Sequence, residues 1–197
     1  GYMGNFGPVS VGASYATKVS MDEFDDYRGL FAENGGFDIP ASLTLGVAWK
    51  PMPQLTLALD WERIYYSDVK SIANASALIG ACAFGDRGAC LGASNGAGFG
   101  WRDIDVWKVG VQYAIDDRWT VRAGYNRGEN PISGQDVTFN ILAPGVMKDH
   151  YTAGVTYQLD KQGAISGFLM YAPSVSVTAP SLLIGFGAPP TTTEKIE

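Results

Sequence analysis

The sequence predicts an all-β fold: an antiparallel up-and-down meander of about seven strands, forming part of a larger transmembrane β-barrel of an outer membrane. Three observations predict it. Six segments alternate apolar and polar residues with a period of two, and a seventh segment is apolar throughout. Short and long connections alternate between these segments. Glycine (25 of 197 residues) and aromatic residues (12%) are abundant, whereas charged residues make up 17%, below the roughly 25% usual in soluble domains.

The expected strands follow one another along the whole chain. In the first six, the apolar side chains occupy every second position: Val9, Val11, Ala13, Tyr15; Leu43, Leu45, Val47, Trp49; Leu55, Leu57, Leu59, Trp61; Trp107, Val109, Val111, Tyr113; Trp119, Val121, Ala123, Tyr125; and Tyr151, Ala153, Val155, Tyr157, Leu159. The seventh segment, 164–177, is apolar on both faces, so its pattern sets no register.

The connections decide between a membrane barrel and a soluble sandwich. Tight turns are expected at 50–53, 116–118 and 161–163, and long connections at 22–40, 71–102 and 130–148. A soluble sandwich usually turns every eight to twelve residues and has no reason to gather its long loops at one end. An outer-membrane barrel has short periplasmic turns and long extracellular loops, so the alternation favours the barrel.

Aromatic residues mark the ends of the predicted strands. Three pairs lie six residues apart on the apolar face, which corresponds to about 15 to 16 Å along the axis of a tilted barrel strand. Aromatic rings at the headgroup level of a membrane explain this placement. Packing inside a soluble sandwich is the alternative. The residues next to the short turns are Trp49, Tyr113, Trp119 and Tyr157.

Small residues recur near the middle of the opposite, polar face: Gly12, Gly46, Ala58, Gly110, Gly124 and Gly154. Glycine weakens a strand, so a repeated set indicates close backbone approach or a space kept open for a plug or a passenger molecule. Relief of steric strain in a curved sheet is an equally good interpretation.

Charge and hydropathy exclude several classes of protein. Acidic residues exceed basic ones by 20 to 14, which argues against a nucleic-acid partner. No stretch approaches about 18 consecutive apolar residues, so no transmembrane helix is expected. The first residues carry no signal-peptide pattern and the last ten resemble an interrupted loop, so we expect a piece of a longer protein.

Four stretches resemble the long-chain fatty-acid outer-membrane transporters, a family that also includes relatives importing aromatic hydrocarbons. They are KPMPQLTLALD (50–60), SDVKS (67–71), AGYNRGENPI (123–132) and FNILAPGV (139–146). The resemblance implies a barrel of about fourteen strands closed by an N-terminal hatch. It also implies that ligands are captured outside in a hydrophobic groove and leave sideways into the membrane through a gap in the wall.

The resemblance covers strands seven to thirteen of that architecture. We therefore expect residues 1–197 to form one partial barrel domain, without the hatch and the final strand. Seven strands cannot close a barrel of this class, so this piece alone should not transport anything.

Catalysis, cofactors and metals are not expected. His150 is the only histidine, and no nucleophile elbow, paired carboxylates or metal-ligand cluster accompanies it. Cys82 and Cys90 lie eight residues apart in the longest loop, where a disulfide that closes a small ring is favoured over metal binding.

The long loops carry the candidate ligand-binding residues. Asp22 as an N-cap, an apolar stripe spaced by three and four, and a Gly35-Gly36 stop predict a helix within 22–40. The stripe either packs against neighbouring loops or forms one wall of the capture groove implied by the resemblance. The residues assigned to the groove are Phe24, Tyr27, Leu30, Phe31, Phe99 and Trp101, with Phe84 and Leu91 as further candidates.

Four charged residues are expected to face the lumen: Asp60, Glu62, Lys108 and Arg122. Because a buried charge needs a partner, the first interpretation is ion pairing with one another or with the hatch. The alternative is that one of the cations meets a fatty-acid carboxylate.

These observations predict passive uptake of long-chain fatty acids or aromatic hydrocarbons across the outer membrane of a Gram-negative bacterium. The partners expected are the ligand, outer-membrane lipid and lipopolysaccharide, and the full-length barrel is expected to be a multi-pass monomer. A general diffusion porin is the first alternative, but it would have more inward charge. A surface adhesion or structural barrel is the second, and it would bind through loops without an apolar groove.

Overall fold

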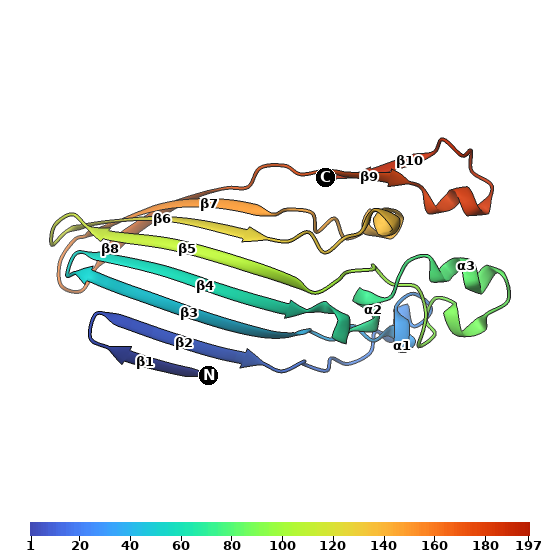
Figure 1. Ribbon diagram of the computed structural model, residues 1–197, viewed down its shortest axis with the longest axis horizontal. Coiled ribbons are helices and arrows are strands. Elements are labelled where there is room, and N and C mark those ends of the chain that lie inside the picture. The colour runs from blue at the N-terminus through green and yellow to red at the C-terminus, as the bar shows by residue number, and fades with distance from the viewer.

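Eight strands form one antiparallel sheet in chain order in the computed structural model, which describes all 197 residues (Figure 1). The predicted meander is confirmed, and the sheet is not closed, with β1 and β8 at its two edges. The strands are β1 (Tyr2–Phe6), β2 (Val9–Ala16), β3 (Ala41–Met52), β4 (Leu55–Tyr65), β5 (Ile104–Ala114), β6 (Trp119–Gly128), β7 (Asp149–Gln158) and β8 (Ala164–Tyr171).

The first strand adds an eighth to the seven expected. β1 pairs with β2 through a tight turn at Gly7-Pro8, where Gly7 has a φ of 61° that favours glycine. Its sequence, YMGNF, does not alternate apolar and polar residues. Periodicity therefore gave no signal for it.

The register places odd-numbered and even-numbered residues of β2–β8 on opposite faces of the sheet. Leu59 lies opposite Val47 and Val109, and Val121 lies opposite Val155. The odd-numbered face is apolar yet covered by no other element, so that about half of the Val109 and Trp49 side chains is exposed. An apolar face of this extent needs an apolar environment.

β8 settles the register that the sequence left open. Ile165 and Leu169 face Tyr157 and Ala153, so Phe168 and Met170 lie on the even-numbered face. The strand ends at Tyr171 rather than at Val177. The chain then forms a separate hairpin of β9 (Val177–Pro180) and β10 (Thr193–Ile196), joined through the 3-10 helix η5 (Leu182–Phe186).

The tight turns lie at one end of the sheet and the long connections at the other, as the alternation predicts (Figure 1). The loop end carries only short helices, none long and apolar enough to cross a membrane. They are α1 (Ala32–Gly35), α2 (Lys70–Ala73), α3 (Leu78–Ala83), α4 (Val137–Asn140), and the 3-10 turns η1 (Asp25–Tyr27), η2 (Tyr66–Asp68), η3 (Arg87–Ala89) and η4 (Gly134–Asp136).

The hydrophobic core sits among the loops rather than between two sheets. Only 24 of the 197 residues are buried, and most of those that are apolar lie at the loop end. One cluster joins the β6–β7 connection to the β9–β10 hairpin: Ile132, Val137, Val146, Ala179 and Ile196, with Trp101 and Val177 packed against it. The loop end is therefore a packed assembly.

Candidate ligand-binding site at the loop end

The prediction of a helix within 22–40 is wrong. The segment contains the 3-10 turn η1 and the single turn α1, whose Glu33 and Asn34 have left-handed φ angles of 57° and 60°. Their backbone N–H groups donate to the carbonyls of Ala93 and Gly92 in the next long loop, at 3.3 and 2.9 Å. Pairing with a neighbouring loop replaces the helical hydrogen bonds.

The aromatic side chains of this segment nevertheless gather as the stripe suggested. The Phe24 and Tyr27 rings lie 6.4 Å apart between centroids, and each lies 6.2 to 6.4 Å from Phe31. Phe24, Tyr27 and Leu30 remain exposed, whereas Phe31 is half-buried. The first three thus form an apolar surface patch that leads to Phe31.

From Phe31 the ring contacts continue through the loop end to Tyr66, the residue that follows β4. Phe31 contacts Phe37 (5.1 Å between centroids), Phe37 contacts Phe99 (6.4 Å), and Phe99 contacts Trp101 (6.5 Å). Trp101 meets Tyr66 edge-to-face at 5.0 Å. We call this series, Phe24, Tyr27, Phe31, Phe37, Phe99, Trp101 and Tyr66, the aromatic chain.

A cavity of about 210 Å³ lies at the inner end of the aromatic chain. Tyr66 and Trp101 line it together with Met147, Lys148 and His150. The Nδ1 atom of His150 is buried and has no hydrogen-bond partner. Tyr66 is half-buried, and this burial raises the pKa of its phenol above the ordinary value. The cavity therefore combines apolar rings with a few polar atoms.

A buried polar cluster holds the inner half of the aromatic chain in place. The indole N–H of Trp101 donates to Oδ1 of Asn140 (2.6 Å), and the Asn140 amide donates to the Phe99 carbonyl (2.7 Å) and the Asp136 carbonyl (2.8 Å). Sequence reasoning missed Asn140 and Asp136 because isolated polar residues in a loop give no local signal. Phe37 and Tyr66 were missed because their contacts are long-range.

The four charged residues assigned to the lumen share the even-numbered face. Lys108 Nζ lies 2.7 Å from Glu62 Oε2, and Asp60 stands opposite Lys108 in the ladder. Arg122 donates to Gln112 (2.8 Å) and Thr156 (2.7 Å) instead of to a carboxylate. One pair thus fits the ion-pairing interpretation, and Arg122 is held by neutral partners.

Three of the small residues form a smooth band across the same face. Ala58 lies opposite Gly110, which lies opposite Gly124. A side chain at Gly110 would meet open space, so no close backbone contact demands a glycine there. The band leaves room above the middle of the sheet.

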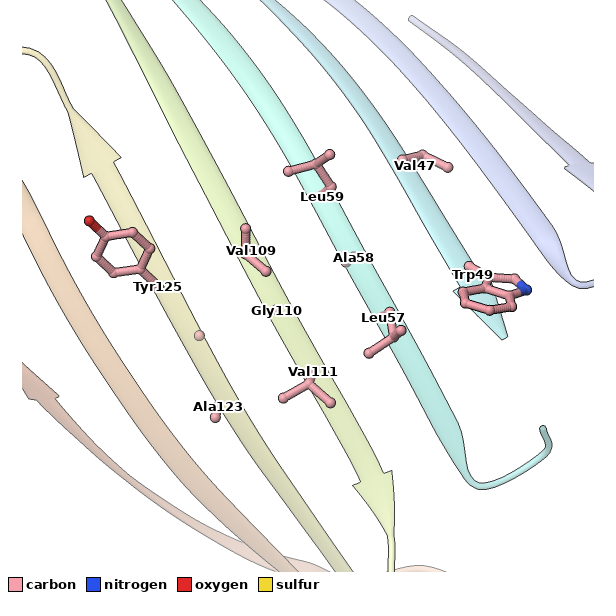
Figure 2. A pocket seen from close by; sticks show the side chains of 11 residues that line it. Val47, Trp49, Leu57, Ala58, Leu59, Val109, Gly110, Val111, Ala123 and Tyr125 are labelled. Carbon is pink, nitrogen blue, oxygen red and sulfur yellow. The ribbon is translucent and has the colours of Figure 1, made fainter. Parts of the chain in front are cut away.

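A larger hollow, of about 630 Å³, lies on the other side of the sheet (Figure 2). Its side chains are those of the apolar face, among them Trp49, Leu57, Val111 and Tyr125. Ala58 and Gly110 belong to the opposite face and border it only because a single layer of backbone separates the two faces. The hollow is thus a depression in the exposed apolar surface of the sheet, and only strand residues line it.

The predicted disulfide is confirmed. Cys82 and Cys90 are bonded, with Cα atoms 4.7 Å apart, at the end of α3 and beside η3. Phe84, inside the ring that the disulfide closes, is 93% exposed and contacts no member of the aromatic chain. No group of three or more His, Cys, Asp or Glu side chains is arranged to hold a metal ion.

Residues 9–172 match the sequence profile of a family described as outer membrane protein transport protein (OMPP1/FadL/TodX). The chain belongs to this family. The resemblance stated from the sequence is confirmed, and the OMPP1/FadL/TodX family is one of outer-membrane transport proteins rather than enzymes. Comparison with curated protein sequences finds no match.

Several solved structures of outer-membrane transporters and channels share the fold of this chain. The Pseudomonas putida toluene transporter TodX matches with a TM-score of 0.56 at 20% identity over 88% of this chain. A Pseudomonas aeruginosa FadL homologue (0.58, 16%, 90%) and the CymD monoaromatic hydrocarbon channel (0.51, 18%, 85%) are similar too. The match covers 41 to 43% of each of these chains, so the present chain spans about two fifths of their length.

Proposed function

We propose that the protein containing this chain takes up hydrophobic small molecules passively across the outer membrane. The aromatic chain is the observation that carries this proposal. It starts at the exposed rings of Phe24 and Tyr27, runs through ring contacts of 5.0 to 6.5 Å, and ends at the cavity lined by Trp101 and Tyr66. In this proposal an apolar ligand passes from the exposed rings to the cavity along these ring contacts.

Burial of the ligand supplies the energy for capture. Removing roughly 200 Å² of apolar surface from water is worth about 5 kcal/mol, at about 25 cal/mol per Å². Because successive rings offer similar contacts, a ligand moves from one to the next without a deep trap. No reaction or nucleotide is needed when the ligand flows down its gradient.

The two faces of the sheet then take different environments. The even-numbered face, with its band of small residues, lines the lumen of the full-length barrel, and the odd-numbered face contacts lipid. The loop end points outward, where lipopolysaccharide forms the outer leaflet. In this proposal residues 1–197 are a partial barrel domain with several membrane crossings, completed by segments outside it, and the full-length barrel is a monomer.

Aromatic hydrocarbons are the substrate class that the ring-lined route favours, because aromatic pairs gain energy from edge-to-face and offset contacts. Long-chain fatty acids are a second candidate. Lys148 and the unpartnered His150 Nδ1 at the cavity favour them, because these groups offer a carboxylate polar partners.

Uptake assays with the full-length protein test the proposal. Cells that express it are given radiolabelled toluene or oleate, and the initial rate of accumulation is measured. Phe31→Ser and Phe99→Ser, within the aromatic chain, should each lower the rate about tenfold. Phe84→Ser is the matched control, because Phe84 is exposed outside the chain, and its rate should stay at the wild-type value.

Heat-modifiable migration on gels verifies that each variant forms its barrel. Wild-type rates for both aromatic-chain variants would contradict the proposed route. A comparison of the two labels separates the substrate classes: Lys148→Gln should slow oleate uptake and leave toluene uptake unchanged if fatty acids are carried.

A further inference from the structure

The apolar face of the sheet ends at a sharp boundary. In β2–β8, odd-numbered strand positions carry no charge except at the loop end, where four occur: Arg63, Asp105, Arg127 and Asp149. Arg63 pairs with Asp105 across the ladder and Arg127 with Asp149, at 3.3 and 3.7 Å between charged atoms. Positive and negative charges thus alternate from β4 to β7, in a row that steps by two residues between β5 and β6, where Arg127 lies opposite Trp107.

The row lies where a membrane interface would be. Trp119 and Tyr157 pack at 4.6 Å near the tight turns, and Tyr125 and Tyr151 at 5.0 Å near the loops. Arg127 follows Trp119 by eight residues, which corresponds to about 20 Å along the axis of a tilted strand. The apolar band of an outer-membrane barrel is about 25 Å tall, so the charges lie near its outer edge.

A polar pocket of about 390 Å³ opens beside this row. Besides Trp107, the residues that line it include three cations and two carboxylates: Arg102, Arg127, Lys148, Asp105 and Glu129. The Arg102 side chain donates only to the Asn130 carbonyl, at 3.2 and 3.3 Å, and neither Arg102 nor Lys148 forms an ion pair. The Asp105 carboxylate already forms an ion pair with Arg63. The pocket, which Glu129 also lines, therefore retains two cationic groups, Arg102 and Lys148, that form no ion pair.

We propose that this pocket binds a phosphate group of lipopolysaccharide, with Arg102 and Arg127 as its principal ligands. A guanidinium group forms paired, charge-assisted hydrogen bonds with phosphate oxygens. The aromatic rings and aliphatic side chains directly below the row, on the same face, would meet the acyl chains of the same lipid. The site combines phosphate recognition and acyl contact in the order that such a lipid presents them.

The pocket adjoins the cavity at the end of the ligand route, because Gly128, Glu129 and Lys148 line both, but Arg102 and Arg127 line the pocket alone. Arg102 and Arg127 belong to no contact of the aromatic chain, whereas Lys148 also lines the cavity at the end of that chain. The tests therefore use the two arginines. The inference rests on the proposed orientation of the loop end outward, and its readout is lipid binding rather than uptake.

Full-length protein in detergent micelles is titrated with bisphosphorylated lipid A, and bound lipid is counted by native mass spectrometry. Arg102→Gln and Arg127→Gln should each weaken binding at least tenfold, or about 1.4 kcal/mol. Arg118→Gln is the matched control, because Arg118 lies beside the Tyr157 hydroxyl (3.2 Å) at the opposite end of the same strands. It should bind like wild type.

The same titration distinguishes the phosphate from its lipid. Lipid A whose phosphates have been removed should bind the wild-type protein weakly. Its affinity should not exceed that of bisphosphorylated lipid A for the arginine variants. Inorganic phosphate should not displace lipid A at equal concentration, and displacement would overturn the lipid assignment. Wild-type affinity in both arginine variants, or equal loss in Arg118→Gln, would overturn the site.

Folding and transport are controlled separately. The side chain of Arg102 donates only to one backbone carbonyl, so Arg102→Gln remains informative if loss of the Arg127–Asp149 pair disturbs folding. Both variants should take up substrate at the wild-type rate. Lipid A binding without any substrate uptake by wild type would defeat the transport proposal alone, and the reverse result would defeat the lipid site alone.

Discussion

The carboxylate of Asp136 accepts two hydrogen bonds from Ser76, one from the backbone N–H at 2.9 Å and one from the hydroxyl at 2.8 Å, across 60 residues of chain. Both residues are buried, and the Ser133 hydroxyl donates to the second carboxylate oxygen. One side chain thus joins the connection after β4 to the connection after β6. Through Asn140 the same cluster reaches Trp101.

Removing this carboxylate should loosen the loop end while the sheet stays folded. Asp136→Ala leaves the buried backbone N–H of Ser76 without an acceptor and the Ser76 hydroxyl with only the Gln135 carbonyl, at 3.3 Å. An unsatisfied buried donor costs about 1 to 3 kcal/mol. We expect amide hydrogen exchange at 70–101 to accelerate about 30-fold or more. Asp136→Asn keeps one acceptor oxygen and should have a smaller effect. Asp117→Ala, in the exposed β5–β6 turn, is the control, and equal exchange in both alanine variants would contradict the prediction.

Gly100 should tolerate no side chain. Its φ is 68°, and a Cβ atom would overlap the Asp136 carboxylate. The left-handed backbone alone costs an alanine about 1 to 2 kcal/mol, and the overlap adds to this. Gly100→Ala should therefore raise exchange at the loop end as Asp136→Ala does. Gly80→Ala, in α3 with open space around the new methyl group, should leave exchange unchanged or slow it.

The disulfide should protect only its own segment. Closing a ring of about nine residues is worth about 2 to 3 kcal/mol in the chain-entropy estimate. The double variant Cys82→Ser/Cys90→Ser should be cleaved faster by protease between Ala83 and Ala89, with urea unfolding of the sheet unchanged. Intact mass without reductant should show no alkylation of the native protein. Two alkylated thiols would refute the bond.

Changes of charge on the two faces of β5 should have unequal effects on the free energy of unfolding. Val109→Arg places a cation on the apolar face at mid-strand, which costs about 2 to 4 kcal/mol near the midplane of a bilayer. Lys108→Ala removes a cation from the other face and should change stability by less than about 1 kcal/mol. Urea unfolding of the full-length protein, followed by tryptophan fluorescence in micelles, measures both. Cooperative folding in plain buffer would instead indicate a soluble core.

Lowering the pH should break the hydrogen bond between Met21 and Asp38 in the first long connection, between β2 and β3. The Met21 backbone N–H donates to Asp38 at 3.0 Å, and this bond, aided by Lys18, lowers the pKa of the Asp38 carboxyl below its ordinary 3.8. The resulting stabilisation is present above the unfolded pKa and lost as pH falls through the folded one. The Met21 amide NMR shift should titrate with a midpoint below 3.8, and not at all in Asp38→Asn. A midpoint at or above 3.8 contradicts this.

The strands whose two faces differ were predictable. In β2–β7 one face is apolar and the other polar, so a period of two reveals each strand and its orientation. β8 also carries Phe168 and Met170 on the polar face, which removed the contrast that defines register. β1 lacked any contrast. Sequence periodicity thus reports the difference between two environments rather than the strand itself.

The candidate site was predictable only in part. Spacing placed Phe24, Tyr27 and Phe31 together, and the structure does the same, although through a 3-10 turn and a bend instead of a helix. The helix failed because hydrogen bonds to residues 92 and 93 compete with local ones. Phe37, Tyr66 and Asn140 join the site by contacts across the chain, and local spacing carries no information about such partners.

The placement of buried residues makes the two ends of this molecule respond to different agents. The sheet has no interior of its own and is stabilised by whatever medium covers its apolar face, whereas the loop end carries its own packed core. Bilayer thickness and detergent chain length should therefore influence the stability of the sheet, and excluded osmolytes such as sucrose that of the loop assembly. A change in the medium that covers the apolar face would thus act on the sheet and leave the packed core of the loop end in place.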